Sequence, residues 1–223
     1  MSPAHITGTD EHIEIRKIFC VGLNYSEHVK EMKAALPQAP VFFLKPATAV
    51  IGDGGTTIRP DISRELHHEV EMTVLIGAGG RNIAREAAFK HVAGYGVGLD
   101  MTLRDIQGDA KKRGLPWTLS KGFDTSAPIS KFVQATTISN PHDLEIALAV
   151  NGMQRQHAST GNLIFKVDYL IWYLSQFFTL ERGDILFTGT PEGVAATVPG
   201  DRLEARLISP GSGVLASLGI RIQ

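Results

Sequence analysis

Strand-like segments outnumber helical ones in this chain, and the two kinds do not alternate. Apolar and β-branched runs bounded by turn residues predict strands at 13–22, 42–46, 68–77, 93–100, 144–150, 185–188, 202–208 and 214–222. Helical patterns cover 26–32, 84–91, 102–114 and 163–180; the last is apolar on nearly all sides, so we expect it to be mostly buried. This irregular order disfavours a doubly wound parallel sheet and favours a strand-dominated α+β fold.

The size and charge of the chain narrow its class further. Its 223 residues are enough for one substantial core, and we expect a lead segment at 1–15 followed by a single domain at 16–223. The formal net charge of −1 gives no support for nucleic-acid binding. No apolar window approaches a membrane span, and residues 1–12 lack the apolar core of a signal peptide. With Cys20 as the single cysteine, no internal disulfide can form, so the expected location is cytoplasmic.

Three acidic residues stand at the ends of apolar strand patterns. Glu69 and Glu71 alternate with Val70 and Met72, so both carboxylates point to one face, with Cα atoms about 6.6 Å apart. Asp100 follows the Gly-rich run 94–99. Three carboxylates without a nearby cysteine suit a hard cation such as Mg²⁺ or Mn²⁺. The alternative is that they are solvated acids on an exposed strand face.

A histidine and a glutamate share one face of the first predicted helix. His28 and Glu31 are three residues apart, and a carboxylate beside an imidazole fixes its tautomer and raises its basicity. Such a pair can remove a proton from water. The alternative is a surface contact of little consequence.

Several cationic or polar residues are further candidates. Lys121 lies in a polar turn and could stabilise developing negative charge, or simply be solvated. Lys45 lies in an apolar strand, where it could meet an anionic substrate or pair with an acid. A helix that starts after Asp100 would bring Arg104 and Gln107 near the same site, whereas the run 111–113 is interpreted as a solvated basic face.

Two glycine-rich segments differ in what they can bind. The turn 188–193 has exposed backbone amides at Gly189 and a hydroxyl on Thr190 that could hold a carboxylate. It is not a Walker A loop, because no Gly-Lys-Ser/Thr follows. The spacing of Gly94, Gly96 and Gly98 does not fit a dinucleotide-binding fingerprint, which excludes that function.

Six segments in register resemble the fumarylacetoacetate hydrolase family, and within it the short acylpyruvate and fumarylpyruvate hydrolases. They are FCVGLNYSEH (19–28), FLKP (43–46), HHEVE (67–71), the run from Gly94-Tyr95 to Arg104-Asp105, SKGFD (120–124) and TGTP (188–191). The resemblance covers the chain from about residue 16 to its end. One difference is Leu23, where many relatives have an arginine; the loss of that charge removes a possible anion contact.

The resemblance implies a mixed β-sandwich roll with a short lid helix, usually as a homodimer. It makes Glu69, Glu71 and Asp100 the ligands of Mg²⁺ or Mn²⁺. It makes His28 and Glu31 the catalytic dyad on the lid, places Lys121 near the metal, and assigns Thr190 to the substrate carboxylate.

The expected activity is metal-dependent hydrolysis of the C–C bond of a 2,4-dioxo acid such as fumarylpyruvate, giving pyruvate and a carboxylic acid. Oxaloacetate decarboxylation, with Gln107 holding the departing carboxylate, is the nearest alternative. Isomerisation or decarboxylation of an unsaturated 2-oxo diacid is another. A non-catalytic metal-binding scaffold is the alternative from a different class.

Overall fold

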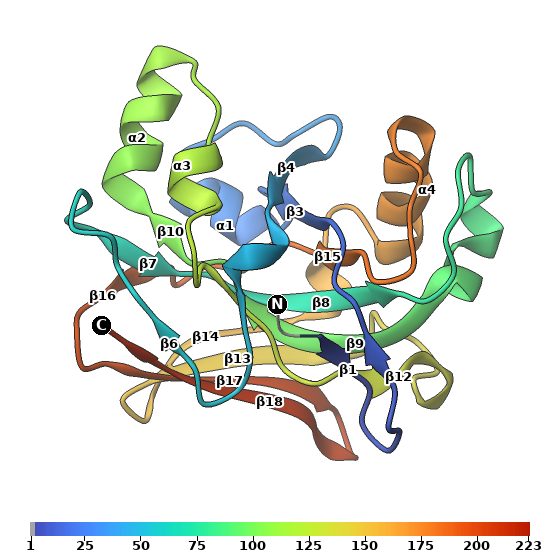
Figure 1. The fold of residues 1–223 in the computed structure, drawn as a ribbon. Helices are drawn as coiled ribbons and strands as arrows, with labels where there is room; N and C mark the ends of the chain where they lie inside the picture. Colours follow the sequence, from blue (N-terminus) through green and yellow to red (C-terminus); the bar gives the residue numbers. More distant parts are fainter. Residues whose placement is uncertain (1–2) are drawn as a thin grey trace.

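The computed structural model describes residues 3–223 and shows two β-sheets packed face to face, with helices above one of them (Figure 1). The six-stranded sheet has the order β12-β9-β8-β15-β3-β4 and the five-stranded sheet has the order β14-β13-β17-β18-β6. The first sheet is formed by Val133–Gln134, Val92–Leu99, Val70–Ile76, Ile185–Phe187, Ile18–Gly22 and Val41–Lys45, in that order. The second is formed by Met153–Ser159, Glu145–Val150, Arg202–Ser209, Gly213–Ile222 and Thr56–Thr57.

Three small sheets complete the β-structure. They have the orders β10-β7-β16, β11-β5 and β1-β2. Their strands are β1 Ala4–His5, β2 His12–Ile13, β5 Val50–Ile51, β7 Leu66–His68, β10 Thr102–Leu103, β11 Ala127–Pro128 and β16 Ala195–Thr197. Both parallel and antiparallel pairs occur, so the predicted strand-dominated α+β class with mixed sheets is confirmed.

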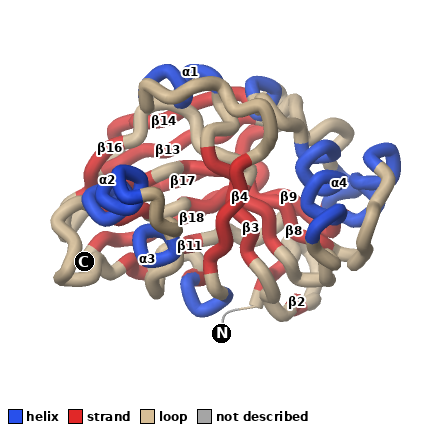
Figure 2. The backbone as a smooth tube through the Cα atoms, turned by 90° about the horizontal axis from the view of Figure 1, so that it is seen from above, coloured by secondary structure: helices blue, strands red, loops and turns tan. Residues whose placement is uncertain are grey.

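Short helices surround strands β3 and β4 when the molecule is seen from above (Figure 2). The α-helices are α1 Ser26–Glu31, α2 Arg104–Arg113, α3 Thr118–Lys121 and α4 Val167–Phe177, and the 3₁₀ helices are η1 Ala47–Ala49, η2 Arg85–His91, η3 Ala135–Thr137 and η4 Thr160–Asn162. Gly114 ends α2 in the left-handed conformation expected of a helix C-terminus. Within the described residues, no helix is long and apolar enough to cross a membrane.

The six-stranded sheet is buried on both faces, and the packing of its strands determines on which face the charged side chain of Glu71 lies. Val70, Met72 and Val74 of β8 belong to the core between the two sheets. A second core contains Ile18 and Cys20 of β3, together with Ile6, Ile13 and Ile15 of the lead segment, so these lead residues pack against the domain. Alternation along β8 therefore sends Glu71 to the face opposite the five-stranded sheet, toward α1, α2 and α3.

The longest predicted helix is shorter and less buried than its sequence pattern indicated. Helix α4 spans Val167–Phe177 rather than 163–180, because the backbone N–H of Ile164 donates to the carbonyl of Asn24 in the lid segment. Val167, Leu170, Ile171 and Leu174 are buried, whereas Phe177 is 61% exposed. Aromatic side chains on the other side stack on one another: Phe165 on Tyr169 and Tyr169 on Tyr173.

Candidate metal centre

Strand pairing brings the three predicted acids together. Glu69 lies between β7 and β8, Glu71 lies in β8, and Asp100 directly follows β9. The antiparallel register pairs Val70 with Leu99, which places Glu69 opposite Asp100, and the Asp100 N–H donates to the Glu69 carbonyl at 2.8 Å. One carboxylate oxygen from each residue lies within 4.8 Å of the others. All three side chains are buried, so the interpretation as solvated acids is wrong.

Lys121 neutralises two of these acids. Its Nζ donates to Glu69 Oε2 at 2.7 Å, to Asp100 Oδ2 at 2.6 Å and to Thr102 Oγ1 at 2.6 Å. Burial opposes the charged form of Lys121, yet the carboxylates of Asp100 and Glu69 raise its pKa. Burial also opposes ionisation of Glu69, but Lys121 and Arg104 outweigh it and lower the pKa of that carboxyl. Lys121 is therefore a buried partner of the acids and not a solvated loop lysine.

Glu71 is the acid that lacks a cationic partner. Its Oε2 accepts a hydrogen bond from the backbone N–H of Gly189 at 2.6 Å, and no Lys or Arg among residues 3–223 forms an ion pair with it. Burial first, and then the charges of Asp100 and Glu69, raise its pKa well above the ordinary value. A buried carboxylate facing two others is stabilised by a cation, and an all-oxygen set of this kind suits Mg²⁺ or Mn²⁺. The residues present fit a divalent metal ion.

Lys45 forms a buried ion pair with one of the acids, Asp100. Its Nζ lies 2.8 Å from Asp100 Oδ1 and donates to the carbonyls of Ser126 at 3.0 Å, Met101 at 3.3 Å and Lys121. The side chain is fully buried. Of the two roles predicted for Lys45, the structure shows pairing with an acid, and its donors are already engaged by protein oxygens.

The start of α2 brings Arg104 and Gln107 to the same place, as predicted. Arg104 pairs with Glu69, and its Nη1 donates to Gln107 Oε1 at 2.6 Å. Gln107 is 3% exposed, and both residues line a cavity beside the acids. The side chain of Glu69 is thus held between Lys121 and Arg104.

Helix α1 places an imidazole beside this cavity. His28 Nδ1 lies 3.1 Å from Glu31 Oε2, which leaves Nε2 for a proton on a substrate. His28 is 5% exposed and lines the cavity. The imidazole is therefore not a surface group, as the alternative of a surface contact required. The other oxygen of Glu31 accepts a hydrogen bond from the Gly193 N–H at 3.1 Å. This contact ties α1 to the loop that carries Thr190.

The turn after β15 requires glycine at position 189. Gly189 has φ +101°, and a Cβ there would lie 2.6 Å from the Cβ of Asn24. Asn24 holds the turn with its Nδ2 on the Thr188 carbonyl at 2.7 Å. Thr190 is consequently buried and lines the cavity, as its predicted contact with a substrate carboxylate requires.

Gln156 is a buried support of the site that sequence reasoning missed. Its Oε1 accepts from the Val70 N–H at 3.0 Å and lies 3.0 Å from His68 Nδ1. Its Nε2 donates to Thr190 Oγ1 at 2.9 Å and to the Pro191 carbonyl at 2.9 Å. One amide therefore connects the strand of the acids to the turn of Thr190. The available signal is alternation in β14, which puts Gln156 on the same inward face as Ala158.

The cavity is small, and its remaining wall is mostly apolar. Its volume is about 30 Å³, enough to admit a water molecule. Its apolar lining includes Leu23, Met32, Phe43 and Trp117. Leu23 adopts φ +59°, an uncommon conformation for a branched side chain. Lys111 of α2 also lines the cavity, and like Lys112 and Arg113 it is exposed, as expected of the basic face at 111–113.

Comparison with known proteins identifies the family. The model of the fumarylacetoacetate (FAA) hydrolase C-terminal domain matches residues 17–220. The mitochondrial oxaloacetate tautomerase FAHD1 of Rattus norvegicus is 48% identical over 190 residues, covering 85% of this chain and 86% of that protein. Oxaloacetate tautomerase YcgM of Escherichia coli K12 is 47% identical over 190 residues, covering 85% of this chain and 87% of its own length.

A solved structure supports the same conclusion. Fumarylpyruvate hydrolase from Pseudomonas aeruginosa, crystallised in complex with Mn²⁺ and pyruvate, is 39% identical with a TM-score of 0.92. The match covers 100% of this chain and 96% of that one. The fold, the buried acidic trio and these relatives agree, and the chain belongs to the fumarylacetoacetate hydrolase family.

Proposed function

We propose that this protein is a metal-dependent enzyme that stabilises the enolate of a small 2-oxo acid. The observation that carries the proposal is one cavity in which His28, backed by Glu31, shares the walls with Glu69, Glu71 and Asp100. A base beside a cation-binding trio is the arrangement that proton abstraction next to a carbonyl needs. Mg²⁺ or Mn²⁺ held by the trio would supply positive charge to the developing oxyanion.

We favour interconversion of the keto and enol forms of a 2-oxo diacid such as oxaloacetate as the reaction. The two tautomerases at 47–48% identity support it. Nε2 of His28 takes a proton from the carbon next to the 2-oxo group, the oxygen takes up a proton, and the imidazolium returns its proton to solvent. Lys121 favours the oxyanion by its charge, while Thr190 holds the carboxylate. The backbone N–H of Gly189, which sequence reasoning assigned to the substrate, donates to Glu71 instead.

Hydrolysis of an acylpyruvate is the second candidate. The Mn²⁺-bound fumarylpyruvate hydrolase supports it. Here His28 takes a proton from water instead of carbon. The hydroxide attacks the C4 carbonyl, the C3–C4 bond breaks, and the pyruvate enolate leaves before it is protonated at carbon. Oxaloacetate decarboxylation uses the same enolate but needs no base, which separates it from both other reactions.

Replacement of His28 by alanine tests the base. We expect the favoured activity to fall by ~10²–10⁴, the usual contribution of general acid–base catalysis, while Mn²⁺ affinity changes little because His28 is not among the acids of the trio. The keto–enol change is followed by the ultraviolet absorbance of the enol, and hydrolysis of acetylpyruvate by pyruvate release, side by side. The matched control is His157→Ala. The exposed His157 lies on the five-stranded sheet, where its Nε2 is 3.0 Å from Glu145 Oε2.

Each pattern of results has one meaning. A His28→Ala variant that keeps full activity on oxaloacetate points to decarboxylation. Equal loss of turnover and of metal affinity would contradict the role of His28 as a base. If calorimetry finds no binding of oxalate, an enolate mimic, to the Mg²⁺-loaded protein, the scaffold alternative is preferred.

We also propose that the protein is a homodimer, as the family resemblance implies. Strand β4 is an edge of the six-stranded sheet, and it borders an apolar groove of about 760 Å³ that includes Phe42, Leu44 and Leu115. Leu44 is 45% exposed. A second copy of the chain would cover this surface. Sedimentation should give a dimer mass for the wild type and a monomer mass for Leu44→Glu; an unchanged dimer would place the contact elsewhere.

A further inference from the structure

One cation on the cavity wall has no carboxylate partner. Lys121 is paired with Glu69 and Asp100, and Arg104 is paired with Glu69 and bonded to Gln107. Lys111 lines the same cavity, yet no acidic group among residues 3–223 lies within 4.0 Å of its Nζ. Its charge is therefore available to an anion that enters the cavity.

The position of Lys111 follows from the geometry of α2. Arg104, Gln107 and Lys111 are spaced by three and four residues, so one face of the helix presents a guanidinium, an amide and an ammonium group. The Lys111 Nζ lies 5.2 Å from the centre of the Trp117 ring, which also lines the cavity. Burial, followed by the charge of Arg104, lowers the pKa of Lys111, and the negative charge of a bound carboxylate would oppose this lowering.

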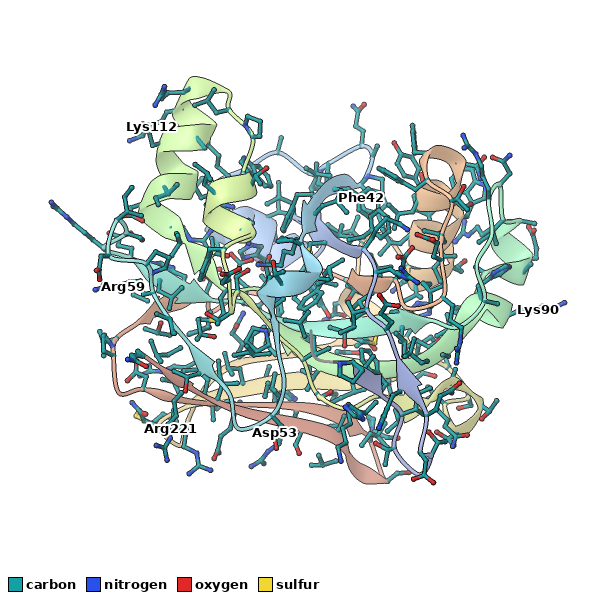
Figure 3. All side chains as sticks on the ribbon, in the orientation of Figure 1. Phe42, Asp53, Arg59, Lys90, Lys112 and Arg221 are labelled. Carbon is teal, nitrogen blue, oxygen red and sulfur yellow. The ribbon has the colours of Figure 1, made fainter. Side chains whose placement is uncertain are left out.

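Leu23, Met32 and Phe43 of the cavity lining are apolar. Lys121, whose Nζ lies 5.1 Å from the centre of the Phe43 ring, is already paired with the acids. An anionic group of the substrate beyond the acidic trio therefore finds its unpaired cation at Lys111. Lys112 is the natural comparison, since it projects from α2 into solvent and does not line the cavity (Figure 3).

We propose that Lys111 binds the second carboxylate of a dicarboxylic 2-oxo acid and so selects diacids over mono-acids. The inference rests on the proposed enolate chemistry and specifies its substrate class. One carboxylate and the 2-oxo group lie toward the acidic trio, and the distal carboxylate reaches the ammonium group at the Trp117 end. The apolar wall at Leu23 leaves this selection to Lys111.

Replacement of Lys111 by methionine tests the inference, because methionine keeps the stem and removes the charge. The ratio of kcat/KM for oxaloacetate to kcat/KM for acetylpyruvate should fall ~10-fold, since a charge-assisted contact is worth somewhat more than a neutral one. The fall should come mainly from KM for oxaloacetate. Lys111→Arg should restore most of the ratio, and Lys112→Met should leave it unchanged.

Two results would overturn the inference, and they are distinguishable. An unchanged ratio in Lys111→Met, with normal wild-type turnover, would reject the role of Lys111 and leave the proposed function intact. A wild-type protein that binds Mn²⁺ but neither binds oxalate nor turns over either acid would reject the proposed function and the inference together.

Discussion

Replacement of Glu71 by glutamine is expected to abolish metal binding while stabilising the metal-free protein. The variant keeps an oxygen for the Gly189 N–H but removes a buried charge that faces Asp100 and Glu69. Loss of a ligand should weaken Mn²⁺ binding by more than ~100-fold, because even residues that merely support ligands contribute 10–100-fold. Calorimetry of the purified, metal-free protein measures this directly.

Thermal unfolding gives a second measure of the Glu71→Gln change. At a metal concentration 100 times its Kd, the wild type should gain ~2.7 kcal/mol, or a rise in Tm of ~5–10 °C. Glu71→Gln should gain almost nothing. Glu145→Gln on the outer sheet is the control, since its partner His157 is exposed and distant from the trio. Undiminished stabilisation of Glu71→Gln by Mn²⁺ would remove Glu71 from the metal site.

The gain in stability of the metal-free Glu71→Gln variant over the metal-free wild type should also depend on pH. The folded-state pKa of Glu71 is raised above the ordinary 4.5, so above pH 4.5 the folded protein retains a proton that the unfolded chain has lost. Metal-free wild-type stability from this group therefore falls as the pH rises through that window. The difference in Tm between the variant and the wild type should grow above pH 4.5 and vanish below it. A constant difference would show that Glu71 titrates normally.

Replacement of Lys121 by methionine should strongly destabilise the metal-free protein. Lys121 is buried and neutralises Glu69 and Asp100, and removal of one partner from a buried ion pair typically costs ~3–5 kcal/mol. For a chain of this length the fall in Tm is on the order of 10 °C. Mn²⁺ should restore much of the loss, because the cation replaces the missing positive charge. Calorimetric scans with and without metal measure both effects.

A lysine away from the site provides the comparison. Lys90 is exposed at the end of η2, far from the helices that cover the cavity (Figure 3). Lys90→Met should change Tm by less than ~1 °C, as surface substitutions usually do. If Lys121→Met were equally harmless, or if metal failed to stabilise it further, Lys121 would not be the neutralising partner of the acids.

Part of the acidic trio was predictable because its geometry is local, whereas the meeting of Asp100 with Glu69 depends on the pairing of β8 with β9. Alternation along one strand fixed the common face of Glu69 and Glu71, and the end of an apolar run marked Asp100. The i, i+3 spacing likewise predicted the contact of His28 with Glu31. Such relations depend only on the repeat of a helix or strand, so the sequence alone specifies them.

The rest depends on contacts between distant segments. Gln156 bonds to His68 and Val70 across 88 and 86 residues, and no local period indicates which polar residue of a strand turns inward to a site. The start of α4 was misplaced for a similar reason, since Leu163 and Ile164 pair with Tyr25 and Asn24 instead of continuing the helix. Lys111 is exposed, as its basic run predicted, but its place beside the cavity depends on how α2 packs, and no local pattern shows this.

The hydrogen bond from Gly193 to Glu31 links the position of α1 to the orientation of His28. One oxygen of Glu31 fixes the imidazole, and the other fastens the short helix α1 to the loop that ends at Gly193. Any displacement of α1 away from this loop must break the hydrogen bond between Gly193 and Glu31. The carboxylate that orients His28 is then less firmly held. If His28 is the base, as we propose, it is oriented by Glu31 only while α1 stays bonded to Gly193.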